Sequence, residues 1–169
     1  MEQALRTEVV IRDGQFCDAE LLWDFLAIAA DEANAVAAKN VPVVACHLEE
    51  WLRPGDFGVI AEHEGVPIGA AWARQFSLSE NPVCYASDRT PEVSIGVISE
   101  LRGLGVGLKL LQCLEVKARR LRLDGLCLNV RDTNPALKLY ERAGYRRIDG
   151  ARFANRIGGL SIWMLLQLR

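Results

Sequence analysis

The sequence predicts a single α/β (α+β) domain that spans residues 1–169, and three observations lead to this prediction. The length of 169 residues suits one domain with a sizeable core. In the first half, two apolar stretches joined by the residues EHEG indicate a β-hairpin. In the second half, residues 92–123 run from a β-branched strand through three glycines into a helix.

The composition is that of an ordinary soluble globular protein. Half of the residues are hydrophobic, 25% are charged, and the net charge is −2. This balance indicates no preference for nucleic acid or for an anionic membrane. The apolar runs are too short for a bilayer span, and the start MEQALRTE lacks the basic and apolar regions of a signal peptide. We therefore expect a cytoplasmic protein with neither a nucleic-acid partner nor a membrane partner.

Cysteine and histidine are placed unfavourably for a disulfide framework or a metal site. The five cysteines are odd in number and show no C-x-x-C spacing, and the two histidines are isolated from each other. We therefore expect no bound metal. The residues concerned are Cys17, Cys46, Cys84, Cys113, Cys127, His47 and His63.

The first half predicts two helices and three strands. A strand is expected over residues 7–12, and a helix with one apolar stripe follows Asp18 as its N-cap. A second, less regular helix is expected over residues 44–52. The hairpin strands are residues 57–61 and 67–76.

The second half predicts a central strand over residues 92–98 and a long helix over residues 108–123. A strand at 126–130 and a short helix follow, and then come strands at 145–148 and 160–168. The buried side of the long helix is expected to contain Leu110, Leu111, Leu114, Ala118 and Leu121.

Caps and charges support these helices. Asn134 before a proline is expected to start the short helix, and Gly144 fits its C-terminal cap. The basic run over residues 117–122 fits a helix C-terminus, which favours cations. No aromatic side chains alternate with that run, so it does not indicate a nucleic-acid site.

The turn between the central strand and the long helix has the features of an anion site. Gly103, Gly105 and Gly107 allow a sharp turn and leave backbone N–H groups free at the start of a helix. These donors and the helix dipole favour a phosphate or pyrophosphate, and Arg102 and Lys109 add positive charge.

Two common phosphate motifs do not fit this turn. A dinucleotide fingerprint needs a third glycine at position 108 or 110, where the chain has Leu108 and Leu110. A P-loop needs a lysine directly after the last glycine, and Leu108 stands there.

The spacing that remains, Arg102-x-x-Gly105-x-Gly107 with Val97 five residues upstream, resembles the coenzyme A motif of the GCN5-related N-acetyltransferase (GNAT) family. The later segment NPALKLYERAGY, residues 134–145, resembles the second signature of that family, although its alanine, Ala136, stands one place early. Two motifs at the expected separation are more specific than either alone. The resemblance covers nearly the whole chain and implies a mixed, mostly antiparallel central sheet flanked by helices.

The resemblance implies acetyl-CoA as co-substrate, bound between the strands at 92–98 and 126–130. Backbone groups of the central strand would pair with the pantetheine amides, and N–H groups of the glycine turn would hold the pyrophosphate. Asn134 would contact the arm of the cofactor, a role compatible with an N-cap. The expected cofactor-binding residues are Ile95, Gly96, Val97, Arg102, Gly103, Leu104, Gly105, Val106, Gly107, Leu108 and Asn134.

The resemblance also implies two catalytic residues. Tyr140 matches the family's general acid, which protonates the departing thiolate, but it also fits a core tyrosine. Glu92 opens the central strand, where the family often has a general base, but it also fits a solvated strand end. The need for a base depends on the acceptor, since an α-amine has a pKa of about 8 and a lysine amine one of about 10.4.

The function implied is acetyl-CoA dependent N-acetylation of a primary amine, which attacks directly in a ternary complex. The amine could belong to a small molecule, an amino acid or a protein. The alternative is a catalytically weak module that binds or senses acyl-CoA. Asn129 stands where the ribosomal-protein branch of the family carries a glutamate, and Ser99 where many members have proline.

The sequence leaves several properties open: the acceptor amine, the range of acyl groups and the oligomeric state. Specificity is expected in residues 31–54 and 79–91, which contain no motif, and the second of these loops is expected near the acceptor. The apolar strand at 160–168 fits either a core strand or the interface of a homodimer.

Overall fold

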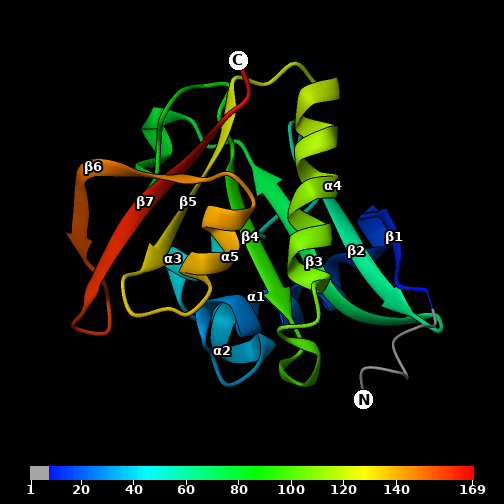
Figure 1. Ribbon diagram of the computed structural model, residues 1–169. Helices are drawn as coiled ribbons and strands as arrows, with labels where there is room; N and C mark the ends of the chain where they lie inside the picture. Colours follow the sequence, from blue (N-terminus) through cyan, green and yellow to red (C-terminus); the bar gives the residue numbers. More distant parts are fainter. Residues whose placement is uncertain (1–7) are drawn as a thin grey trace. The chain divides into compact units, whose positions relative to one another are not determined.

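The computed structural model describes residues 8–169, which form two compact units. The first unit comprises the chain up to Arg74 together with Ser94–Leu114, and the second comprises Gln75–Val93 together with Glu115–Arg169. Two elements pass from one unit into the other, strand β4 (Glu92–Val97) and helix α4 (Val106–Arg120) (Figure 1). Thr7, the first residue of the first predicted strand, lies outside the described residues.

The strands of the first unit are β1 (Val10–Asp13), β2 (Phe57–His63) and β3 (Val66–Arg74), which pair antiparallel in this order. The predicted hairpin is confirmed, and its turn residues Glu64 and Gly65 both have positive φ, 52° and 76°. Two positive φ angles are typical of a type I′ turn, whose twist matches that of the flanking strands.

Three helices belong to the first unit: α1 (Ala19–Ala30), α2 (Ala35–Lys39) and α3 (Pro42–Ala45). The single helix predicted over residues 44–52 is wrong in extent, because α3 ends at Ala45 and turns follow. Helix α2 was not predicted. Its signal is Asn34, whose side chain accepts a hydrogen bond from the N–H of Ala37 at 3.0 Å.

Helix α1 begins after Asp18 as predicted, but the carboxylate of Asp18 does not cap that helix. It accepts two hydrogen bonds of 2.8 Å from the guanidinium of Arg12 and one of 2.7 Å from the backbone N–H of Gln15. The bonds from Arg12 lower the pKa of Asp18. Asp18 thus ties β1 to the start of α1.

The second unit continues the sheet from β4. Strand β5 (Gly125–Arg131) runs parallel to β4, with Glu92 opposite Cys127, and pairs antiparallel with β7 (Leu160–Gln167). Strand β7 pairs antiparallel with β6 (Arg146–Ala154). Followed through β4, the strand order is β1-β2-β3-β4-β5-β7-β6. The predicted mixed, mostly antiparallel sheet flanked by helices is therefore confirmed.

Strand β6 is longer than the predicted strand at 145–148. Its register against β7 shifts between Arg147 and Arg152, so two short ladders are joined by an irregular stretch. Such an irregularity breaks the alternation from which strands are predicted.

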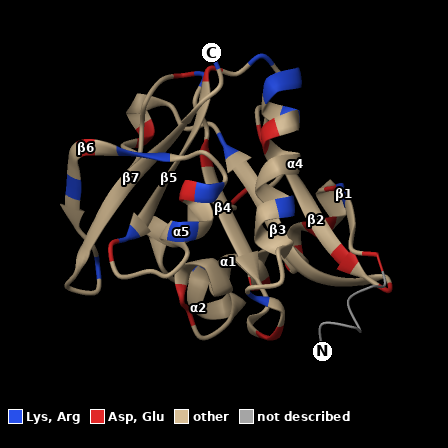
Figure 2. Ribbon diagram, in the orientation of Figure 1, with Lys and Arg blue, Asp and Glu red and all other residues tan. Residues whose placement is uncertain are grey.

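Helix α4 begins at Val106, two residues earlier than predicted, and ends at Arg120. Four of its five predicted core residues are buried, but the expectation for Leu121 is wrong, because Leu121 lies beyond the helix and is 55% exposed. The last turn of α4 carries Lys117, Arg119 and Arg120 (Figure 2). These cations lie at the negative end of the helix dipole, as expected.

Helix α5 (Leu137–Arg142) has Ala136 rather than Asn134 at its N-cap position. The expected N-cap role of Asn134 is therefore wrong. Instead its Oδ1 accepts a hydrogen bond of 2.9 Å from the N–H of Ala136, which stabilises the turn before the helix. Gly144 follows the helix with φ 96° and donates to the carbonyl of Glu141, which confirms its C-terminal role.

Candidate functional site

The glycine turn, residues 103–107, lies in the first unit and opens α4. Gly103 and Gly105 have φ of 78° and 86°, and a Cβ on either would meet no atom within 4 Å. Backbone conformation, and not crowding, therefore requires glycine here. The backbone N–H of Lys109 donates to the carbonyl of Gly105 at 3.1 Å. The backbone N–H groups just before Lys109 therefore belong to the first turn of α4, where they have no acceptor within the helix. The turn is open and fits an anion such as pyrophosphate.

The strand before the turn is held closely against α1 at Gly96. A Cβ on Gly96 would lie 2.3 Å from the carbonyl oxygen of Phe25, so this position excludes every other residue. Arg102 donates from Nε to the carbonyl of Val97 at 3.2 Å, which fixes the loop relative to the strand. Its exposed guanidinium keeps a positive charge beside the glycine turn.

Glu92 and Asn129 face each other on β4 and β5 in the second unit. Glu92 is only 3% exposed, so the alternative of a solvated strand end is wrong. The Nδ2 of Asn129 donates to its Oε1 at 2.5 Å. An amide N–H is a donor, so the carboxylate oxygen acts as the acceptor. Asn129 was noted from the sequence only as a departure from one branch of the family, and this contact was not predicted.

Tyr140 lies on α5 in the second unit and is 9% exposed. Its ring meets that of Tyr145 edge to face, with centroids 6.2 Å apart. Burial raises the pKa of Tyr140 to about 12, so the phenol is neutral at physiological pH. It is a hydrogen-bond donor of low acidity.

The predicted site residues thus fall into two groups. The glycine turn and Ile95, Gly96 and Val97 belong to the first unit, whereas Glu92, Asn134 and Tyr140 belong to the second. Across residues 8–169, no three histidine, cysteine or acidic side chains are grouped so that they could hold a metal ion. No helix in that part of the chain is both long and apolar enough to cross a bilayer.

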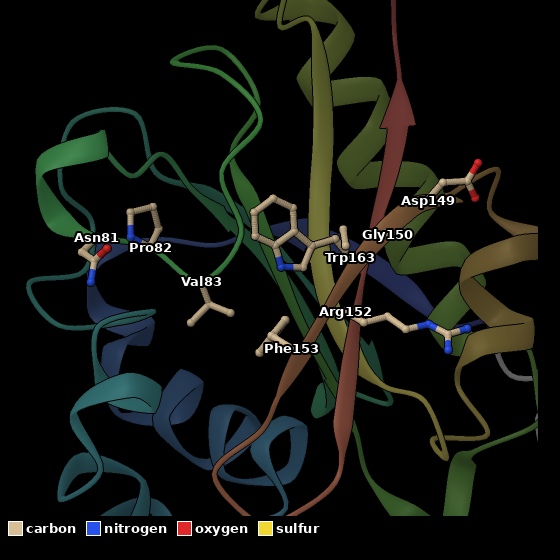
Figure 3. A pocket seen from close by; sticks show the side chains of 9 residues that line it. Asn81, Pro82, Val83, Asp149, Gly150, Arg152, Phe153 and Trp163 are labelled. Carbon is tan, nitrogen blue, oxygen red and sulfur yellow. The ribbon is translucent and has the colours of Figure 1, made fainter.

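A pocket of about 610 Å³ lies within the second unit. Val83, Phe153 and Trp163 stand around its centre, and the side chains of Asp149 and Arg152 extend away from the indole (Figure 3). Specificity was expected in residues 79–91, and part of that loop lines this pocket. Trp163 was not predicted as a site residue. The sequence marked it only as an aromatic residue with a polar N–H group within an apolar strand.

Comparisons with known proteins agree with this geometry. The family model described as the acetyltransferase (GNAT) family matches residues 20–145. The comparison with curated proteins finds no match.

Solved structures share the fold. A ribosomal-protein-alanine N-acetyltransferase from Brucella melitensis is 25% identical, with a TM-score of 0.69 over 94% of this chain and 99% of that one. An N-acetyltransferase from Staphylococcus aureus Mu50 is 21% identical, with a TM-score of 0.68 over 96% and 99%. A Salmonella typhimurium protein described as an acetyltransferase, solved with its cofactor acetyl-CoA, is 22% identical, with a TM-score of 0.69 over 95% and 94%.

The family model covers most of the chain, and the sheet order and glycine turn agree with it. The chain therefore belongs to the acetyltransferase (GNAT) family.

Proposed function

We propose that this protein is an N-acetyltransferase that uses acetyl-CoA and transfers its acetyl group to a primary amine. The observation that carries the proposal is the glycine turn, whose left-handed residues Gly103 and Gly105 open α4 in the region matched by the family model. The backbone N–H groups of residues 103–108 hold the pyrophosphate, and Arg102 contributes charge. Backbone groups of residues 95–97 hold the pantetheine arm, with Asn134 as a further contact.

The co-substrate supplies an activated acetyl group as a thioester. Tyr140 acts by donating a hydrogen bond to the thiolate that develops on transfer. Its pKa of about 12 lies above the pKa of about 8.5 of a free thiol. Complete proton transfer from Tyr140 is therefore uphill, and stabilisation of the sulfur's negative charge by a hydrogen bond suits this phenol better than outright proton donation.

Glu92 acts as the general base that removes a proton from the amine, directly or through a water molecule. Asn129 fixes the orientation of its carboxylate through the 2.5 Å hydrogen bond. The burial of Glu92 and its hydrogen bond from Asn129 support this assignment, because a buried carboxylate held in one orientation presents its oxygens in a defined direction.

A binding experiment tests the glycine turn. Calorimetric titration with acetyl-CoA and with CoA should show binding by the wild type and none by Gly105→Glu, whose carboxylate would repel the pyrophosphate. The matched control is Gly158→Glu, because Gly158 also has positive φ and open space around it but lies outside the turn. Equal binding by wild type and Gly105→Glu would contradict the pyrophosphate assignment.

A turnover experiment tests the chemistry. Thiol release from acetyl-CoA, measured against a panel of amines and peptides, should fall at least about tenfold in Tyr140→Phe with cofactor affinity unchanged. Tyr145→Phe is the control, since it removes the hydroxyl of the neighbouring ring. Tight binding without thiol release on any amine would favour the acyl-CoA sensing module instead. A cytoplasmic location and a homodimer stay predictions.

A further inference from the structure

The indole of Trp163 carries a donor that finds no acceptor in the described part of the protein. Its Nε1 is shielded from solvent and makes no hydrogen bond there. A buried donor left unsatisfied is unfavourable, because it has lost its hydrogen bonds to water. Such a group calls for an explanation, and a ligand that supplies the missing acceptor is one.

The pocket at the indole has an apolar part. Val83 and Phe153 line it together with Trp163, and Asn81, Asp149 and Arg152 also belong to its lining (Figure 3). Val83 belongs to the loop between β3 and β4, is 37% exposed and stands outside any helix or strand. A partly exposed loop side chain moves at low cost. A ligand entering the pocket can therefore displace Val83 and reach the indole N–H.

The pocket is connected to the proposed base through three neighbouring strands. Trp163 on β7 stands directly opposite Asn129 on β5, and residues paired in an antiparallel ladder have side chains on the same face. Asn129 in turn holds Glu92 on β4. Glu92, Asn129 and Trp163 thus form a row on one face of the second unit. A ligand bound beside Trp163 lies along the row that leads to Glu92.

From this row we infer that the pocket is the acceptor site and that it selects primary amines with a large apolar group and an uncharged oxygen acceptor. The apolar group packs between Val83 and Phe153, and the oxygen accepts from Nε1 of Trp163. Trp163 is thus a specificity-determining residue. The inference rests on the proposed acetyl transfer, because it assigns the substrate of that reaction.

Three primary amines separate the contribution of the apolar group from that of the oxygen acceptor. Phenylalaninamide has both features, phenethylamine lacks the oxygen, and glycinamide lacks the apolar group. We expect kcat/KM to be at least about tenfold higher for phenylalaninamide than for glycinamide. Trp163→Phe should reduce the advantage of phenylalaninamide over phenethylamine about fivefold, since it keeps an apolar ring and removes the donor. Equal rates for all three compounds would overturn the inference.

A blocking variant tests the location of the pocket. Val83→Trp should fill the pocket and raise KM for phenylalaninamide at least about tenfold while acetyl-CoA binding stays unchanged. The matched control is Leu78→Trp, because Leu78 is also an exposed residue of this loop, 69% exposed, but does not line the pocket. An unchanged KM in Val83→Trp would contradict the location.

A direct binding measurement separates the inference from the proposed function. In ¹⁵N-labelled protein, the indole signal missing from Trp163→Phe identifies Trp163, and phenylalaninamide alone should shift that signal. A shift together with no thiol release on any amine would mean that the pocket stands and acetyl transfer fails. Thiol release with an unmoved Trp163 signal would mean that acetyl transfer stands and this acceptor site is wrong.

Discussion

Two tryptophans of the first unit and one of the second differ in how their indole N–H groups are satisfied. In the first unit, Trp51 donates to the carbonyl of Gln15 and Trp72 to that of His47, both at 2.9 Å. In the second unit, Trp163 has no acceptor in the described chain. Both paired tryptophans belong to the buried core of the first unit, whereas Trp163 borders a pocket. A paired donor stabilises the fold, whereas an unpaired donor gains from a ligand that supplies an acceptor.

The buried carboxylates of the two units also differ in a hydrogen-bond partner. In the first unit, Arg74 and Asp56 form an ion pair of 2.6 Å that is almost inaccessible to solvent. Arg74 also donates to the carbonyl of Cys46, and Asp56 accepts from the N–H of Arg53. In the second unit, the buried carboxylate of Glu92 is held by a neutral amide, that of Asn129. One partner of each buried carboxylate thus differs, a cation for Asp56 and a neutral amide for Glu92.

Breaking the ion pair should have the largest effect on stability. Arg74→Met leaves the carboxylate of Asp56 buried without its cation, and we expect a loss of about 3–5 kcal/mol in the free energy of unfolding. The exposed pair of Arg89 and Asp124, 3.4 Å apart, provides the control. Arg89→Met should cost less than about 1 kcal/mol. Urea unfolding checks both values, and similar losses would refute the assigned role of burial.

The paired and unpaired tryptophans should differ in how much their substitution destabilises the fold. Trp72→Phe removes a paired donor and leaves a gap in a fully buried site, so it should cost about 2 kcal/mol or more. Trp163→Phe removes a donor without an acceptor from a half-buried site, so stability should change by less than about 0.5 kcal/mol. Thermal or urea unfolding of the two variants side by side measures the difference. A larger loss in Trp163→Phe would mean that its indole stabilises the fold.

Substitutions of Asn129 should affect stability less than the two preceding changes and should affect turnover more. Asn129→Leu removes the donor to Glu92 and should cost about 1–2 kcal/mol in unfolding free energy. Asn129→Asp instead places a second carboxylate beside Glu92. Its loss of turnover should therefore exceed that of Asn129→Leu, which removes the donor without adding a charge. Equal losses in the two variants would indicate that Asn129 acts by packing alone.

Local patterns were sufficient to predict the hairpin, the central strand, the glycine turn and the identity of helix α4. They failed for the segment between α1 and β2, where two short helices replace the predicted one. Helices of four or five residues carry too little periodicity to be recognised, and caps such as Asn34 decide where they begin.

The candidate site was predictable only where it depends on local sequence. Motif spacing identified the glycine turn and Tyr140 as candidates, and the resemblance to the family added Glu92 at the start of the central strand. The contact of Asn129 with Glu92 and the row that ends at Trp163 depend on the register of strands far apart in the chain. A sequence pattern within one strand contains no information about that register.

A small effect of opposite sign is expected at Tyr145, whose hydroxyl is buried and has no partner in the described chain. Tyr145→Phe removes that unsatisfied group, so stability at pH 8 should stay the same or rise by up to about 1 kcal/mol. Burial raises the pKa of Tyr145 well above 10. The unfolded chain therefore releases the phenolic proton at a lower pH than the folded chain. Wild-type stability accordingly falls as pH rises above 10, and the phenylalanine variant lacks this contribution.

Urea unfolding at pH 8 and near pH 11 tests this sign. The stability of Tyr145→Phe relative to wild type should be greater at the higher pH, and the remaining pH dependence should include that of Tyr140, whose pKa is raised to about 12. A variant that is less stable than wild type at both pH values would show that the hydroxyl has a partner. Tyr145 would then belong with the paired groups of the first unit, and Trp163 would be left as the second unit's unpaired donor.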